Sequence, residues 1–373
     1  GARLSSAAQG PVSAVAAATA LGGTGWAFCE VWAREAASPS VPSNKLASFG
    51  LGDIPASAYK GHFAGAYDAA ATQSAANVAR RRPDAGADEP ASEQQLRLSI
   101  ARRLMQRLGY TAQELELLGE DVLRMQGVRS PFAAARLREG EAVLDLGCGF
   151  GADAFLAAAK VGPSGRVLGA DLSSEELRRA TSRARERGLA PQQCSFLEAD
   201  MEALPLATGS LDVVISNGGF CLCPSKPAAF REVHRVLRPG GRLAIACTVL
   251  RKPLPALEGR RWPPCMEVFL PRGDIEGLLS GIGFSAVSVD EGSSRMDVWE
   301  LSDADIDGVA QGLGPEGGCS HARKAAERRA REEVDTFLAR DREAGIHWGN
   351  PEFAHVQDFD MNELCARVVI HAE

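Results

Sequence analysis

The sequence has no continuous run of about 18 apolar residues, the length that a membrane-spanning helix requires. It also has no excess of positive charge, because 41 Lys and Arg residues against 48 Asp and Glu residues give a formal net charge of −7. A surface that is negative overall repels phosphate backbones. No serine-nucleophile motif, phosphate-binding lysine loop or zinc-ligand spacing is found. We therefore expect no stable membrane insertion and no nucleic acid as partner.

The nine cysteines are an odd number and lack the regular spacing of a secreted disulfide framework. This favours a reducing compartment. Residues 1–29 contain no acidic residue and a single base, Arg3. They fit either the remnant of an organelle transit segment or a linker between domains. We expect a cytoplasmic location, or an organellar one if residues 1–29 are such a remnant.

Composition divides the chain into three parts. Residues 1–91 are rich in Ala, Ser, Gly and Pro, which predicts a low-complexity, largely disordered or targeting segment. From Leu96 to Leu108 apolar residues recur every four positions, as in an amphipathic helix. Thr111 followed by Glu114 predicts the capping box of a second helix. We expect a folded domain over residues 92–300 and a helical or α+β C-terminal appendage over 301–373, which ends in a strand.

Between residues 141 and 250 short apolar runs alternate with helical stretches, in the order of βαβ units on a parallel sheet. Strands are expected at 142–147, 166–172, 194–200, 211–217 and 242–250. Helices are expected at 152–159, 175–187 and 226–237. The fold class is therefore α/β, with a Rossmann-like, mainly parallel central sheet flanked by helices.

A glycine-rich turn, DLGCGFG, follows the first expected strand and runs from Asp145 to Gly151. Glycines let backbone amides approach a ligand closely, and this turn of a parallel sheet lies where ligands bind. Asp171, at the tip of the second strand, is positioned to accept both hydroxyls of a ribose. A glycine loop alone also fits a structural turn or a nicotinamide dinucleotide site. Its companions along the chain are therefore needed to decide.

Three further stretches accompany the loop: DMEALPL from Asp200, VISN ending at Asn217, and RVLRPGG ending at Gly241. Together with DLGCGFG, they resemble the ordered motifs of the class I S-adenosylmethionine-dependent methyltransferases. The resemblance covers about residues 141–250. It implies that the cofactor is S-adenosylmethionine and that the activity is methyl transfer to a small-molecule acceptor.

The same resemblance implies a place for each matching residue. The ribose would lie on Asp171 with Leu172 beside it, and the adenine near Asp200 and Met201. Asn217 would line the methyl-transfer side as a candidate catalytic residue. The methionine end of the cofactor would lie on the loop residues Asp145, Gly147, Cys148, Gly149 and Gly151. Within this loop, Cys148 is expected to be a small packing residue and not a reactive thiol.

Several longer stretches are similar to the arsenite methyltransferase family, among them VGPSGRVLGADLSSEEL and WPPCMEVFLPRGDIEGLLSGIGF. That family collects its metalloid on cysteines from three places, and only Cys265 is clearly kept. The other two positions fall on Val128 and Gly218. Cys221 and Cys223 lie nearby and, in an extended loop, would point to the same side. Soft thiolates suit trivalent arsenic, so Cys221, Cys223 and Cys265 are candidate arsenic-binding thiols, and no other metal site is expected.

The resemblance leaves the acceptor open. Arsenite or a thiol-bound trivalent arsenical is the first hypothesis, with glutathione or thioredoxin as reductant. The alternative is a C-, O- or N-methyltransferase of a quinone, sterol or lipid-like molecule, in which Cys221 and Cys223 only line an apolar pocket. A further alternative is a non-catalytic protein that binds the cofactor and interacts with a partner.

Overall fold

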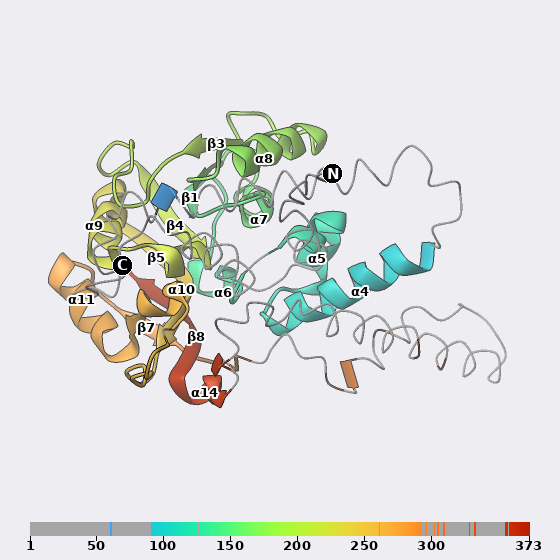
Figure 1. Ribbon diagram of the computed structural model, residues 1–373. Helices are drawn as coiled ribbons and strands as arrows, with labels where there is room; N and C mark the ends of the chain where they lie inside the picture. The colour runs from blue at the N-terminus through green and yellow to red at the C-terminus, as the bar shows by residue number, and fades with distance from the viewer. Residues whose placement is uncertain are drawn as a thin grey trace, which may run out of the picture.

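The computed structural model describes residues 60–61, 91–125, 127–260, 262–292 and 358–373, and the short pieces 295–296, 302, 304–305, 309, 328, 332 and 355–356. The expectation of disorder or targeting for residues 1–91 lies outside the described residues, except at residues 60, 61 and 91. The same holds for most of the expected helical part of the appendage. Within the described residues, the elements run in order from α4 to β8 (Figure 1).

The domain begins with helices that precede the first strand. α4 covers Ala91–Arg107 and α5 covers Ala112–Leu118. The expected capping box of α5 is confirmed, because the Glu114 backbone N–H donates to the Thr111 hydroxyl and the Thr111 N–H donates to the Glu114 carboxylate. The 3₁₀ helix η1 (Gly119–Arg124) and the short α6 (Phe132–Ala135) then lead to β1.

The βαβ order expected from the sequence is confirmed. The strands are β1 (Ala142–Leu146), β2 (Arg166–Asp171), β3 (Cys194–Glu198), β4 (Leu211–Asn217) and β5 (Leu237–Leu250). The intervening helices are α7 (Ala152–Val161), α8 (Ser174–Glu186), η2 (Gly219–Leu222) and α9 (Lys226–Val236). The later elements are α10 (Pro264–Glu267), β6 (Leu270–Pro271), η3 (Arg272–Asp274), α11 (Ile275–Ile282), β7 (Ser288–Asp290), α14 (Met361–Leu364) and β8 (Cys365–Ala372).

β5 starts earlier than the expected residue 242. Leu237 already pairs with Leu211, and the register then shifts so that Arg242 pairs with Val213. Residues 238–241, the RPGG turn, therefore bulge out between two paired positions of one strand.

The strand order is β3-β2-β1-β4-β5-β8-β7, with β6 paired to β5 beside this path. β1 to β5 run parallel to one another, and β8 runs antiparallel to both β5 and β7. The chain turns outward in opposite directions from β1, because β2 lies on one side of it and β4 on the other. Such a switch point opens a crevice at the carboxyl ends of the strands.

β8 belongs to the central sheet, although it was expected in an appendage separate from the domain over 92–300. It pairs with β5 over eight residue pairs, from Leu243↔Ala372 to Leu250↔Cys365, and lies between β5 and β7 in Figure 1. Its side chains are almost all buried. We propose that the domain includes residues 361–373 and that a boundary near residue 300 does not separate them from it.

Alternate residues of the parallel strands face two separate cores. Val143 and Ile215 pack with side chains of α4, α5 and α7 on one face of the sheet. Leu144, Val214 and Ile245 pack with α9 and α11 on the other. Burial on both faces explains why the strands read as continuous apolar runs and not as alternating patterns.

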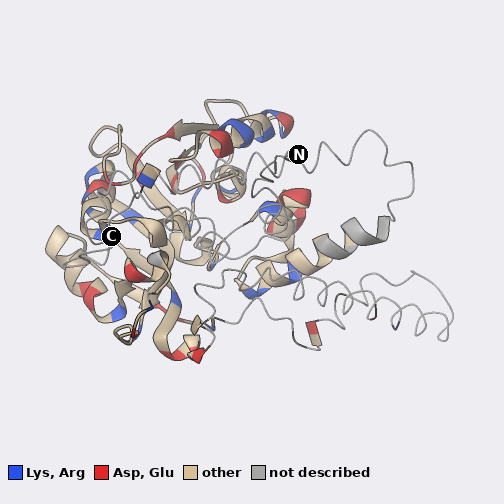
Figure 2. Ribbon diagram, in the orientation of Figure 1, with Lys and Arg blue, Asp and Glu red and all other residues tan. Residues whose placement is uncertain are grey.

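Charged side chains on the described helices pair locally, as α8 shows in Figure 2, where acidic and basic residues lie side by side. Glu175 there accepts hydrogen bonds from both Arg178 and Arg179. Among the described residues, no helix has the length and apolar character needed to cross a bilayer.

Candidate functional site

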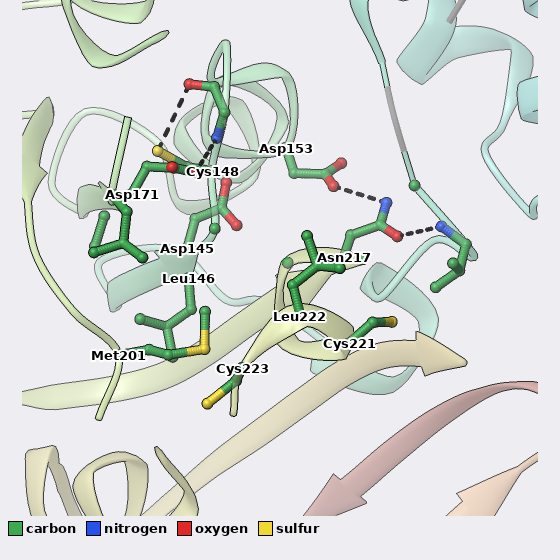
Figure 3. A pocket seen from close by; sticks show the side chains of 18 of the residues that line it. Asp145, Leu146, Cys148, Asp153, Asp171, Met201, Asn217, Cys221, Leu222 and Cys223 are labelled. Carbon is green, nitrogen blue, oxygen red and sulfur yellow. Dashed lines mark hydrogen bonds between the residues drawn. The ribbon is translucent and has the colours of Figure 1, made fainter. Parts of the chain in front are cut away.

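A cavity of about 200 Å³ lies at the switch point of the sheet. Of the predicted site residues, only Gly151 is absent from its lining. Those that line it are Asp145, Gly147, Cys148, Gly149, Asp171, Leu172, Asp200, Met201, Asn217, Cys221, Cys223 and Cys265. Figure 3 shows the glycine turn and Asp171 at one end of this cavity and the Cys223 thiol towards the other.

Close contacts leave no room for a side chain at two positions of the glycine turn. A Cβ added at Gly147, whose φ is +71°, would lie 2.8 Å from the Cα of Gly219. Gly151 begins α7, and a Cβ there would lie 2.9 Å from the ring of Phe196, so Gly151 packs against the core. Cys148 is 8% exposed, and its sulfur lies 2.8 Å from the position that a Cβ on Gly169 would take. These contacts agree with a packing role for Cys148.

Asp171 faces the glycine turn from the end of β2. Its Oδ2 accepts a hydrogen bond from the Gly149 N–H at 2.9 Å, and its Oδ1 accepts one from the Ser173 N–H at 3.0 Å. Each carboxylate oxygen has more than one acceptor site, so these bonds orient the side chain and still allow it to accept hydroxyl protons. The cavity is open beside it and not filled by side chains.

Asp145 provides the buried charge of the site. Its side chain lines the cavity, the residue is 2% exposed, and its Oδ2 is a buried atom without a hydrogen-bond partner. Burial, and then the carboxylates of Asp153 and Asp171, raise the pKa of Asp145 well above its ordinary value. An unsatisfied buried carboxylate is costly, and a cationic group bound in the cavity would compensate for this cost.

Sequence reasoning missed Tyr110 and Asp153, which support this end of the cavity. The Tyr110 hydroxyl donates to Asp153 Oδ1 at 2.8 Å. Burial is the main cause that raises the pKa of Asp153 to about 6, against the hydrogen bonds from Tyr110 and Asn217 that lower it. Burial likewise raises the pKa of Tyr110 well above its ordinary value. Tyr110 lies in the turn between two helices, so no sequence motif marks it.

Asn217 connects this pair to the segment before β1 (Figure 3). Its Nδ2 donates to Tyr110 at 2.7 Å and to Asp153 at 3.1 Å. Its Oδ1 accepts a hydrogen bond from the Val128 N–H at 2.8 Å. All of its amide groups are therefore engaged with the protein, which makes Asn217 a residue that holds the cavity wall in place. Val128 and Gly218, where the resemblance leads us to look for cysteines, both line the cavity.

Asp200 lines the cavity next to Met201, as expected, and has a partner that the sequence did not reveal. Lys60 Nζ donates to Asp200 Oδ2 at 2.7 Å and to Glu202 Oε2 at 2.5 Å. The two acids raise the pKa of Lys60, although burial, the largest single influence, acts to lower it. Glu202 also accepts a hydrogen bond from the Cys223 thiol at 3.2 Å.

The expectation that Cys221 and Cys223 point to the same side of an extended loop is wrong. Cys221 lies in the 3₁₀ helix η2, and Cys223 follows it directly. The Cys221 sulfur accepts a hydrogen bond from the Thr248 N–H, whereas the Cys223 thiol points to Glu202, and Figure 3 shows the two sulfurs directed apart. A 3₁₀ helix advances about 120° per residue, so residues two apart do not share a face.

Cys265 lines the cavity from α10, so all three candidate cysteines are among its lining residues. Within the described part of the chain, no three His, Cys, Asp or Glu side chains are grouped as a metal site. Burial, the largest influence on both thiols, raises the pKa of Cys221 above its ordinary value and the pKa of Cys223 to about 12. The charge of Lys226 acts to lower both pKa values. The two thiols are therefore neutral at pH 7.

Residues 137–263 match the sequence family described as methyltransferase domain. The chain contains a class I methyltransferase domain. The cofactor of this class is S-adenosylmethionine. The fit to this chain rests on the orphaned Asp145 Oδ2, which lies where a cationic cofactor would be held, and on Gly147 of the glycine turn, where the contact with Gly219 leaves no room for a side chain.

Relatives of the methyltransferase domain include arsenite methyltransferases. One, from Halobacterium salinarum, is 35% identical over 208 residues, which is 54% of this chain and 52% of that protein. Another, from Aquipseudomonas alcaligenes, is 42% identical over 117 residues, 30% of this chain and 33% of that protein. The chain thus spans about half, or less, of the length of these relatives.

The methyltransferase domain also resembles a protein with another acceptor and a solved structure. A demethylmenaquinone methyltransferase from Lactococcus lactis is 39% identical over 104 residues, 28% of this chain and 40% of that protein. A solved structure of an arsenic(III) methyltransferase from Chlamydomonas reinhardtii is 22% identical, with a TM-score of 0.44, and the match covers 72% of each chain. The fold assignment follows from the strand order and directions given above.

Proposed function

We propose that the protein transfers a methyl group from S-adenosylmethionine to a small acceptor, and that this acceptor is arsenite or a thiol-bound trivalent arsenical. One observation carries the proposal. A single cavity is lined by residues of the glycine turn and Asp171 and also by three cysteine residues, Cys221, Cys223 and Cys265. The two arsenite methyltransferases from Halobacterium salinarum and Aquipseudomonas alcaligenes support the choice of acceptor.

The cofactor end of the cavity is formed by residues whose geometry suits an adenosyl sulfonium. Asp171 receives the ribose hydroxyls, and Asp145 balances the positive charge of the methionine end. Asp200 and Met201 lie beside the adenine. Asn217 keeps the wall between the two ends in place through its four hydrogen bonds. This part of the proposal needs no movement of the glycine turn.

At the acceptor end, thiol exchange binds the arsenical. A thiol of Cys221, Cys223 or Cys265 forms an S–As bond and displaces the acceptor's hydroxide or thiol ligand, which leaves with the thiol proton. Because the three thiols are not grouped as a ready-made ion site, an arsenical that brings its own thiolate ligands suits the cavity best. It needs only one or two cysteines from the protein.

The chemistry of the transfer explains why no general base is required. S-adenosylmethionine supplies the methyl group, the arsenic lone pair forms the new bond, and the electron pair of the broken bond stays on sulfur in S-adenosylhomocysteine. The arsenic lone pair carries no proton to remove, and no histidine is among the described residues that line the cavity. The product arsenic is formally pentavalent. Glutathione or thioredoxin would return it to the trivalent state with two electrons, becoming a disulfide.

The test is methylarsenical formation from arsenite, S-adenosylmethionine and glutathione, followed by chromatography. Wild-type protein is expected to form product. Cys265→Ser, Cys221→Ser and Cys223→Ser are compared with Cys365→Ser, a control in which a buried thiol outside the cavity lining is changed. Loss of product with the cavity variants and not with the control supports the proposal. Unchanged activity in all three cavity variants contradicts it.

An organic acceptor is the second candidate. The same cavity has an apolar wall formed by Leu222, Phe269 and Met296. Burial keeps Cys221 and Cys223 protonated, which agrees with a lining role as well as with ligation. A methyltransferase active on a quinone or lipid-like acceptor, and inactive on arsenite, would establish this candidate. A chain that binds no S-adenosylmethionine would instead indicate a non-catalytic interaction protein.

A further inference from the structure

Lys226 is a buried cation directly behind the acceptor end of the cavity. The residue is 5% exposed, and its Nζ donates three hydrogen bonds, all to backbone carbonyl oxygens. The acceptors are Cys221 O at 2.9 Å, Cys223 O at 2.6 Å and Val268 O at 2.9 Å. An ammonium group has three N–H donors, so the donor capacity of Lys226 is fully used.

The three carbonyl groups come from two separate segments. Cys221 and Cys223 lie in and after η2, which follows β4. Val268 follows α10, the helix that carries Cys265, and lies 42 residues from Lys226 in the sequence. One ammonium group thus joins the segment that holds two of the candidate thiols to the segment that holds the third.

Fold stability alone does not explain why a lysine is buried at position 226. Burial of an ammonium group is unfavourable unless hydrogen bonds compensate, and a well-packed apolar residue would fill the same volume without this cost. Lys226 also sits at the start of α9, where Ser225 already caps the helix through the Ala228 N–H. The helix therefore does not need the charge of Lys226 for its N-terminus, where a cation is unfavourable.

We propose that Lys226 is a positioning residue of the acceptor site, which sets the spacing between the Cys221–Cys223 loop and Cys265. This inference rests on the proposed function, because it concerns the thiols assigned there. Lys226 does not line the cavity and does not touch the acceptor. It acts through the backbone of the residues that do. Without it, the loop and the α10 segment remain in the fold but lose their common anchor.

The experiment uses phenylarsine oxide, a trivalent arsenical that condenses with two thiols and releases water without a change in oxidation state. Its capture by the full-length protein is measured for wild type, Lys226→Ala and Lys226→Met. Lys252→Ala is the control, because Lys252 is an exposed lysine that pairs with Glu363 at the surface. Titration with S-adenosylmethionine in parallel reports on the other end of the cavity.

We expect both Lys226 variants to capture phenylarsine oxide roughly 10- to 100-fold more weakly, the usual cost of losing a residue that orients ligands. S-adenosylmethionine affinity should be unchanged. Propylammonium added to Lys226→Ala should restore part of the capture, because it returns an ammonium group to the space that the side chain left. A residue with only a general packing role would not respond to the amine.

Two results would overturn the inference. One is unchanged capture in both variants while wild-type capture depends on Cys221, Cys223 or Cys265. The other is that both variants lose S-adenosylmethionine binding and also lose capture of phenylarsine oxide. Lys226 would then be a determinant of the whole fold. Failure of the proposed function looks different, because wild-type capture would then be insensitive to serine substitution of these three cysteines.

Discussion

The Tyr110 hydroxyl and Asp153 Oδ1 are 2.8 Å apart, and their hydrogen bond joins the turn between α4 and α5 to the first turn of α7. Both groups are buried, and Tyr110 is 3% exposed. This pair lies behind Asp145 and holds Asn217, so it links the helices before β1 to the floor of the cavity. Titration of Asp153 should therefore change the stability of the fold with pH.

The pKa of Asp153 predicts how stability changes with pH. Because the folded value, about 6, lies above the ordinary value of 3.8, the folded state holds a proton that the unfolded state releases first. The contribution of Asp153 is therefore most favourable below about pH 4 and is lost as pH rises through about 6. Relative to Asp153→Asn, wild-type protein should lose on the order of 3 kcal/mol of unfolding free energy across this window. Urea unfolding at several pH values measures it, and parallel curves for the two proteins would refute it.

We predict that cofactor binding releases a proton from the carboxyl group of Asp145. Its pKa lies well above the ordinary value, so the buried carboxyl keeps its proton to a higher pH than an exposed aspartate does, and a bound cation lowers that pKa. Calorimetric titration with S-adenosylmethionine in two buffers of different ionisation enthalpy should reveal the release. Asp145→Asn should bind more weakly and release fewer protons. The control is Asp290→Asn, at an exposed surface ion pair with Arg129. Equal proton release by wild type and Asp145→Asn would argue against this role.

The close approach between Gly147 and η2 is expected to matter for both stability and cofactor binding. Gly147→Ala places a Cβ 2.8 Å from the Gly219 Cα, in a residue with φ of +71°. Gly240→Ala is a matched control, because its φ is +75° but no atom lies within 4 Å of the added Cβ. The control should lose about 1–2 kcal/mol of unfolding free energy from backbone strain alone. Gly147→Ala should lose clearly more unfolding free energy and should also bind S-adenosylmethionine weakly. Thermal and chemical unfolding separate the two, and equal losses would show that the close approach is unimportant.

The sequence was sufficient to predict the strands and the residues at their carboxyl ends. The apolar runs mark β1, β2 and β4, and strand ends in a parallel sheet meet at one edge, which brings Asp145, Asp171 and Asn217 together. The local signal for the capping box at Thr111 was also sufficient, because both of its hydrogen bonds lie within one turn.

Residues whose role depends on tertiary contact could not be predicted. Lys226 carries no signal of burial, since lysine is normally exposed and only the surrounding carbonyls make its burial possible. Lys60 and Tyr110 meet their partners 140 and 43 residues away in sequence. The last strand was recognised as a strand, but its place between β5 and β7 depends on long-range pairing that no local pattern contains.

The most direct test of the account is calorimetric titration of the purified chain with S-adenosylmethionine, compared with Asp171→Ala. Glu198→Ala is the control, because Glu198 pairs in register with Asp171 on the neighbouring strand and is exposed. We predict one site per wild-type chain, unchanged binding by the control, and binding roughly 10- to 100-fold weaker in Asp171→Ala, the cost of losing hydrogen bonds to a charged group. No binding by wild type, or equal binding by Asp171→Ala, would contradict the account.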